Sequence, residues 1–150
     1  MARNNFAQTT SVEVAAAVGS FKTILQLLAA TNTIVAVQGV DLSFDGVSNT
    51  AEPVQWEVVR QTTTGTMSAR NPLKTKDTST ALTTTGQENA SAEPTTTDIL
   101  ACGHIHPQAG MLYVLPLPDG EVEMASATRL GLRINAPAAV NCRARFHGEE

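Results

Sequence analysis

Apolar and polar side chains alternate with a period of two along most of this chain. Between residues 33 and 45, Val40, Leu42 and Phe44 fall on one face of an extended backbone, and polar side chains separate them. Successive side chains of a β-strand point to opposite faces, so this pattern predicts a strand with one face in a hydrophobic core. An Asp-Gly pair, which favours a tight turn, ends the segment.

Later segments repeat this alternation. Trp56 lies between Gln55 and Glu57, so we expect its ring to point inward as a core side chain, as we do for Phe44. Short strands of this kind, separated by Pro and Gly turns, favour two packed sheets. The inward residues predicted from these later segments are Val54, Trp56, Val58, Met111, Tyr113, Leu115, Leu117, Val122, Met124, Leu130, Leu132, Ile134, Val140, Cys142, Ala144 and Phe146.

Residues 21–30 fit two patterns. Phe21, Ile24, Leu25 and Leu28 have helical spacing, yet alternate residues of the same run are also apolar. The run is short for a helix and turn-forming residues bracket it, so we predict a strand.

The predicted fold is all-β, a single jelly-roll-type β-sandwich of residues 12–150. Residues 1–11 precede it as an extended N-terminal arm, in which Phe6 is the only large apolar side chain. A length of 150 residues suits one domain with a hydrophobic core of its own.

A Thr-rich excursion at about residues 61–97 interrupts the alternation. Thr triplets occur at 62–64, 83–85 and 95–97, and apolar side chains are sparse. Long stretches without a regular pattern are uncommon in compact domains, which leaves two alternatives. The excursion is either a flexible arm that a partner orders or a partly ordered pair of short edge strands. The extended preference of Thr suits an arm laid along another surface.

The composition excludes several classes of function. Hydrophobic residues make up 42% of the chain, which excludes wholesale disorder. Ten Lys and Arg residues against 14 Asp and Glu give a net charge of −4, and the basic residues are scattered, so we expect no nucleic-acid binding. Aromatic residues, at 4%, are too few for a sugar-stacking or base-stacking surface.

The sequence predicts neither a signal peptide nor a membrane segment. Glu13 breaks the early apolar patch, and polar residues interrupt the uncharged stretch of residues 23–40. Without a secretory signal we expect synthesis inside a cell, with Cys102 and Cys142 as reduced thiols rather than a disulfide.

Two predicted strands carry paired arginines on their polar faces. Arg129 and Arg133 alternate with apolar residues in one strand, and Arg143 and Arg145 do so in the other. We expect a solvated face, because charges on an outer strand face usually lie in water. The alternative is one wall of a contact surface for an acidic partner.

The segment Cys102-Gly-His104-Ile-His106 is the one stretch with metal-binding chemistry. On an extended strand Cys102, His104 and His106 share a face at steps of about 7 Å, and His-x-His offers two imidazoles to one metal. The run from His104 to Leu115 also resembles the first motif of the cupins, which are metal-binding β-barrels.

In a cupin a liganding Glu follows the two histidines, and another His comes from a second motif. Gly110 and Met111 occupy the matching positions here, and His147 is the one other histidine. Two ligands are too few for a catalytic metal, so we expect His104 and His106 to be structural or solvent-facing, with no cofactor bound. An opportunistic metal at an interface is the alternative.

Other catalytic patterns are missing from the sequence. It has no Gly-x-Ser-x-Gly elbow, phosphate-binding loop, Cys-x-x-Cys pair or Gly-x-Gly-x-x-Gly motif. Glu121 and Glu123 lie on the polar face of a strand, where solvation suits them poorly for general acid catalysis. We therefore expect no catalytic residues and no enzymatic activity.

The strand and turn pattern from about Phe21 to Phe146 resembles small virion proteins of tailed bacteriophages, in particular head decoration (cement) proteins. The segments that carry the resemblance include Phe44-Asp45-Gly46, Glu52-Pro53-Val54 and Arg129-Leu130-Gly131. The resemblance implies a non-enzymatic jelly roll that binds the outside of an icosahedral shell and reinforces it, often as trimers. Its partners would be the major capsid protein and neighbouring copies, after synthesis in the host cytoplasm.

Under this hypothesis the arm and the excursion supply the candidate capsid contacts, which are Asn5, Phe6, Arg70 and Lys74. A virion adhesion or carbohydrate-binding module on the same scaffold is the first alternative, although it calls for exposed aromatic residues. A cupin-like metalloenzyme that uses His104 and His106 is the second.

Overall fold

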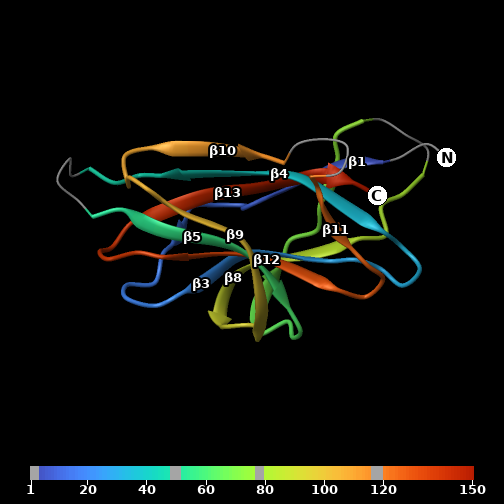
Figure 1. Cartoon of the computed structure of the whole chain (residues 1–150), viewed down its shortest axis with the longest axis horizontal. Coiled ribbons are helices and arrows are strands. Elements are labelled where there is room, and N and C mark those ends of the chain that lie inside the picture. Colours follow the sequence, from blue (N-terminus) through green and yellow to red (C-terminus); the bar gives the residue numbers. More distant parts are fainter. Residues whose placement is uncertain (1–3, 48–51, 77–79, 116–119) are drawn as a thin grey trace.

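The chain forms two β-sheets packed face to face, shown in the computed structural model of Figure 1. The structure describes residues 4–47, 52–76, 80–115 and 120–150. Within these ranges there are strands and no helices, and the named strands pair antiparallel. A search of the same ranges for a helix able to cross a membrane finds none. The all-β prediction and the two-sheet sandwich are confirmed.

The seven-stranded sheet has the order β10-β4-β13-β1-β7, and the short strands β11 and β2 pair with β4 and β13. Its strand β4, next to β10 in this order, is the strand predicted over residues 33–45. The bounds in this sheet are β1 Asn5–Thr9, β2 Val14–Ala15, β4 Val35–Phe44, β7 Leu73–Lys74, β10 Gly110–Val114, β11 Val122–Met124 and β13 Asn141–Glu149.

The six-stranded sheet has the order β6-β8-β3-β12-β5-β9. Its strand β3 lies within the ambiguous segment of residues 21–30, so the strand prediction there is confirmed. The bounds are β3 Lys22–Leu28, β5 Val54–Gln61, β6 Thr66–Ala69, β8 Thr85–Ala92, β9 Thr96–Ile105 and β12 Arg129–Asn135.

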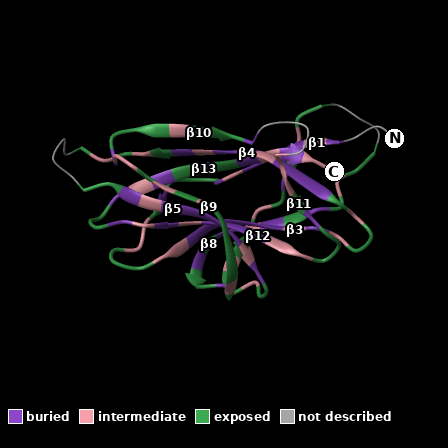
Figure 2. Cartoon of the chain, viewed as in Figure 1, coloured by how far each residue is buried: buried purple, intermediate pink, exposed green. Residues whose placement is uncertain are grey.

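The hydrophobic core lies between the two sheets, where buried residues of both layers face each other (Figure 2). Trp56 is 5% exposed and half-buried Phe44 packs against the core, as predicted. Tyr113 lies at the margin of this core, where its ring centroid is 5.4 Å from that of Trp56. Leu117, another predicted inward residue, lies outside the described residues.

The expected N-terminal arm needs correction. Residues 5–9 form β1, which pairs with β13 on one side and β7 on the other. Phe6 is 1% exposed and belongs to the core. A single apolar residue suffices because β1 is held mainly by backbone pairing and by one buried amide.

That amide belongs to Gln8, which is fully buried next to the core. The two N–H groups of its side-chain nitrogen are shared among the backbone carbonyls of Gln26, Arg70 and Gln87, which lie 3.1, 2.8 and 3.1 Å from the nitrogen. Gly86 leaves the space for this amide, since a Cβ at that position would collide with it. Gln8 therefore ties β1 to the opposite layer through hydrogen bonds, which hydrophobic periodicity does not reveal.

The Thr-rich excursion is an ordered two-stranded ribbon over its described residues. The chain from β5 into β6 runs antiparallel to the chain from β8 into β9, with Gln61 opposite Thr96 and Thr66 opposite Ala92. The near half, β5 and β9, lies at one end of the six-stranded sheet. The far half, β6 and β8, pairs with β3 at the other end. The ribbon must therefore bend at residues 62–65 and 93–95, and Figure 1 shows β8 and β9 converging below the sheet.

The bend covers the outer face of the six-stranded sheet, and the residues that it buries there are polar. Thr23, Gln26 and Gln61 are 0%, 2% and 5% exposed. The Gln26 amide donates to Gln61 Oε1 at 2.7 Å and to the Thr63 carbonyl at 3.0 Å, and the Gln61 amide donates to Thr23 Oγ1 at 3.0 Å. This network replaces an apolar contact between the ribbon and the sheet.

Four carboxylates fasten distant segments by the same arrangement. Each accepts one hydrogen bond from a backbone N–H, at 2.7–2.8 Å, and one from the side chain of that same residue. We call these pairs carboxylate clamps. They are Glu88 with Ser11, Glu93 with Thr23, Glu150 with Thr83, and Asp45 with Asn141.

Two clamps shift the acidity of their carboxyl groups. Hydrogen bonds from the side chain and the backbone of Asn141 hold the pKa of Asp45 below its ordinary value. Burial acts to raise the pKa of Glu150, but the combined hydrogen bonds from Thr84 and Thr83 outweigh it and lower that pKa. Both clamps therefore favour the ionised carboxylate.

Truncation of the core tryptophan should destabilise the whole sandwich. We expect Trp56→Ala to lower the free energy of unfolding by roughly 3–5 kcal/mol, because it leaves a cavity between the sheets. Urea unfolding measures the change. Val18→Ala, at a residue that is 58% exposed, is the control and should stay within about 0.5 kcal/mol of wild type. A Trp56→Ala protein with an unchanged unfolding midpoint would show that the ring is not a core anchor.

The clamps of Asp45 and Glu150 predict acid-sensitive stability. Because each folded pKa is lowered, each carboxylate stabilises the fold above its ordinary pKa near ~4, and this stabilisation disappears as the pH falls through the folded pKa. The double variant Asp45→Asn, Glu150→Gln should therefore lose less unfolding free energy than wild type between about pH 5 and about pH 2.

Urea titrations across this pH range measure the difference. The control is Glu13→Gln, Glu52→Gln, which removes two carboxylates from exposed residues and should follow the wild-type pH dependence. Equal acid losses in wild type and in the clamp variant would contradict the prediction.

Candidate functional site

The two flanks of the sandwich, where the sheet edges lie one above the other, are built differently. On one flank β1 and β7 lie near β6 and β8, and hydrogen bonds connect the two layers. The Arg70 guanidinium donates to the carbonyl and hydroxyl oxygens of Thr9 at 2.6 and 3.1 Å, close to the three bonds of Gln8. We call this side the closed flank.

On the other flank β9 is the edge of one sheet, and β10 and β11 lie along the edge of the other. We call this surface the open flank. The contacts that span it include the Trp56–Tyr113 ring contact and a hydrogen bond from Arg60 to the Glu123 carbonyl at 3.3 Å. Large apolar side chains remain exposed here. They are Ile99 (54%), Leu100 (39%), Leu112 (60%), Tyr113 (38%) and Val114 (58%).

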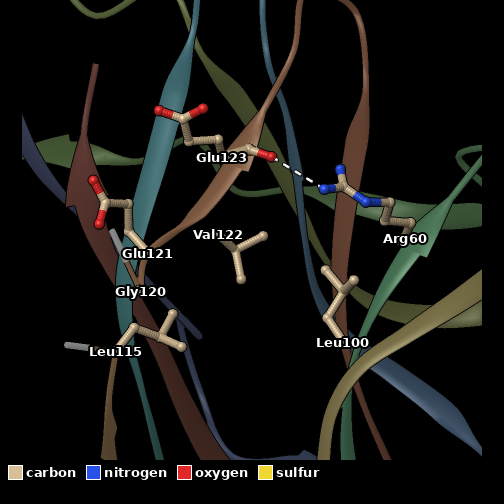
Figure 3. Close-up of a pocket in the computed structure, with 7 residues that line it drawn as sticks. All are labelled: Arg60, Leu100, Leu115, Gly120, Glu121, Val122 and Glu123. Atoms are coloured by element: carbon tan, nitrogen blue, oxygen red, sulfur yellow. Dashed lines mark hydrogen bonds between the residues drawn. The ribbon is translucent and has the colours of Figure 1, made fainter. Parts of the chain in front are cut away.

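A hollow of about 520 Å³ opens between the layers on this flank. Figure 3 shows Leu115 and Val122 on one side of it and Leu100 and Arg60 on the other. The remaining lining residues are Gly120, Glu121 and Glu123. One Glu121 carboxylate oxygen is buried and has no hydrogen-bond partner among the described residues. The hollow thus combines apolar walls with a partly charged rim.

This arrangement suits binding of another protein surface. Exposed apolar side chains that cluster beside polar residues mark protein contact sites in soluble proteins. An edge strand also presents unpaired backbone groups that a second chain can use. The open flank offers both features in one place, whereas the closed flank uses its polar groups within the chain.

One sequence feature indicates the exposed apolar residues of this flank, although the strand periodicity did not identify them. Residues 111–115 read Met-Leu-Tyr-Val-Leu, five apolar residues in succession. With Met111 and Tyr113 inward, Leu112 and Val114 must occupy the outer face, where alternation calls for polar side chains. An unbroken apolar run in a half-buried strand therefore indicates exposed apolar residues.

The four predicted capsid contacts lie close to one another, and the side chains of Phe6, Arg70 and Lys74 make contacts within the chain. Phe6 is opposite Lys74 in the β1–β7 pair, next to Asn5, but its side chain is buried and unable to contact a shell. The Arg70 guanidinium is bonded to Thr9, and Lys74 Nζ donates to the Thr80 carbonyl at 3.0 Å. The surface most suited to contact is therefore on the opposite flank.

The two arginine pairs do not form one contact wall. Arg129 and Arg133 belong to β12 of the six-stranded sheet, while Arg143 and Arg145 belong to β13 of the other sheet, on opposite outer faces. The predicted solvated face describes only some of these arginines. Arg133 forms an ion pair with the buried Glu57 at 2.6 Å.

Arg133 also stacks on the ring of Phe21, with its guanidinium carbon 4.2 Å from the ring centroid. On the other sheet Arg145 pairs with Asp41, and Arg143 is exposed. Both sheets thus use arginine to organise their own outer faces.

The three predicted metal-binding residues do not share one environment in the structure. Cys102 and His104 lie on β9 at exposed positions, opposite Glu57 and Gln55 of β5. His106 follows the strand, and its Nδ1 accepts a hydrogen bond from the Gln108 N–H at 3.2 Å. No group of three or more His, Cys, Asp or Glu side chains suited to hold a metal occurs among the described residues.

Two further titratable side chains, half-buried His147 and buried Cys142, belong to β13 itself. His147 lies over Gly39, and burial lowers its pKa despite the nearby Asp41 carboxylate. Cys142 is 1% exposed, and burial raises the pKa of its thiol to about 12. Both cysteines are free thiols, with Cys102 exposed.

Comparison with known proteins gives no match to a family model, a curated protein sequence or a solved structure. The residues of the chain itself therefore carry the functional inference.

Purified protein should carry no stoichiometric transition metal. The geometry around His104 and His106 offers too few ligands, so His104→Gln, His106→Gln should leave metal content and thermal stability unchanged. Metal analysis of wild type and of this double variant, as free protein and as assembled particles, tests the expectation. About one equivalent of metal that the double variant loses would favour a metal-binding function instead.

Proposed function

We propose that this chain is a structural virion protein that binds the outer surface of a tailed-phage capsid and reinforces the shell. One observation carries the proposal, the exposed apolar residues of β9 and β10 on the open flank, of which Leu100 also lines the hollow. Burial of such side chains against another protein supplies the main driving force for association. The resemblance to decoration proteins names the partner surface as the capsid exterior.

The rest of the molecule suits a reinforcing role. The closed flank, the core and the clamps of Glu88 and Glu150 restrain the two sheets against each other, so a force on one flank is transmitted to both layers. We also propose that the sandwich is of the jelly-roll type. The long bent ribbon of β5–β6 and β8–β9 supports this, because a jelly roll contains such a folded antiparallel pair.

The proposed partners are the major capsid protein and neighbouring copies of the chain. Many weak contacts on a repeating lattice add through avidity, so modest affinity per copy is enough to hold the shell. The protein performs no catalysis in this proposal, and its proposed location is the outer surface of the virion.

Charge placed on the β9 part of the open flank should weaken shell binding. We expect Ile99→Asp, Leu100→Asp to lower affinity for capsids at least about tenfold, because two apolar contacts become charged groups that must be desolvated. Co-sedimentation with capsids stripped of this protein measures binding, and the heat resistance of the particles measures reinforcement.

Leu73→Asp is the matched control, since Leu73 is 65% exposed on β7 at the closed flank. It should bind and reinforce capsids as wild type does. Equal binding by wild type and by the β9 variant, or binding of wild type to cell surfaces but not to capsids, would contradict the proposed function.

A further inference from the structure

We infer that β10 is a dimerisation edge, which pairs antiparallel with β10 of a second copy across a two-fold axis at Leu112. The pairing would join two seven-stranded sheets into one continuous sheet. The inference goes beyond the proposed function and does not depend on it, because it is argued from the backbone and side chains of β10 alone.

About half of the backbone N–H and C=O groups of β10 form hydrogen bonds to β4. The N–H of Phe44 donates to the Ala109 carbonyl at 3.4 Å, and the N–H of Leu115 donates to the Gln38 carbonyl at 2.9 Å. Between these ends the β10–β4 register has no shift. In an antiparallel pair the residues alternate between facing the partner strand and facing away. The odd-numbered residues therefore bond to β4.

The even-numbered residues Gly110, Leu112 and Val114 consequently point their N–H and C=O groups toward the open edge. Among the described residues, β10 pairs with β4 and with no other strand. An edge with free donors and acceptors is a template for one further strand.

This edge is complementary to itself. When two copies of β10 align antiparallel about Leu112, Leu112 lies opposite Leu112 of the second copy, and Gly110 lies opposite its Val114. Each outward-pointing N–H group of β10 then lies opposite an outward-pointing C=O group of the second copy, and each such C=O group lies opposite an N–H group. Centring the axis on Met111 or Tyr113 would leave some of them unpaired. The strand thus has its outward-bonding residue at its centre, as an isologous pair requires.

The side chains are compatible with this register. Leu112 and Val114 are 60% and 58% exposed on the outer face, so pairing would bring apolar groups together. On the inner face Met111 would meet Tyr113 of the second copy. Residues 110–114 contain no charge, so no like charges oppose each other in self-pairing.

The edge strands β9 and β7 carry protection that β10 lacks. β9 has Asp98 and two register shifts, and bulges and charges are the usual means of blocking an edge. β7 is two residues long and includes Lys74. β10 has no charge, no proline and no bulge. The occupant that this neutral, symmetric edge fits is therefore a second copy of this chain.

Substitution of Leu112 by residues of opposite charge tests the inference in the absence of capsids. By analytical ultracentrifugation over a concentration series, wild type should approach twice the 15.8-kDa chain mass. Leu112→Lys and Leu112→Glu should each stay at one chain mass, because each places like charges directly opposite each other. An equimolar mixture of the two variants should restore the double mass, and native mass spectrometry should show the mixed pair.

The control exchanges are Leu73→Lys and Leu73→Glu on the closed flank, which should leave the wild-type mass unchanged. Leu112→Pro is the second variant, because it removes an open N–H without removing a bond to β4, and it should also be monomeric. Unfolding midpoints for each variant separate loss of pairing from loss of fold.

A monomeric wild type, a trimer, or a mixture of the charge variants that remains monomeric would overturn the inference. If wild type is monomeric but Leu112→Lys no longer binds capsids, the edge belongs to the shell protein instead of a second copy. Failure of the capsid-binding test with intact dimerisation would overturn the proposed function and leave the β10 pair standing.

Discussion

The bend in the two-stranded ribbon is the constraint on which the rest of the structure depends. β8 and β9 lie on opposite sides of the β3-β12-β5 group, yet residues 93–95 join them directly. The six-stranded sheet must therefore curl, and its outer face becomes the inside of the bend. The same bend sends β6 and β8 to the closed flank and leaves β9 on the open flank.

The polar network beneath the bend makes this arrangement specific. A buried amide that loses its partner costs about 1–3 kcal/mol, so Gln26 and Gln61 tolerate few alternative positions for the ribbon. Gly131 leaves space for this network, because a Cβ at that position would collide with the Gln61 amide. The clamp between Glu93 and Thr23 then fixes the β8–β9 connection against the end of β3. An apolar contact is not directional and would have allowed the ribbon more freedom to shift along the sheet.

Hydrophobic periodicity was enough to predict the strands whose inner faces form the core, including the position of Trp56 and the strand nature of β3. It did not predict β1, and for the ribbon it left a pair of short edge strands as one of two alternatives, because Gln8 and Gln26 hold these segments by hydrogen bonds that alternation does not encode. The predicted capsid contacts stay a prediction, and periodicity did not show that Arg70 and Lys74 also bond to their own chain. The open flank was within reach of the sequence, because five consecutive apolar residues cannot all face one core.

The unequal burial of the two cysteines has a practical consequence for chemical labelling. The Cys142 thiol is enclosed and its pKa is raised to about 12, so it forms little thiolate near neutral pH. Cys102 is exposed on β9, beside the apolar cluster of the open flank. A maleimide dye would therefore attach at one position per chain without mutagenesis. Its fluorescence would report directly on whether that face of the molecule is in water or covered.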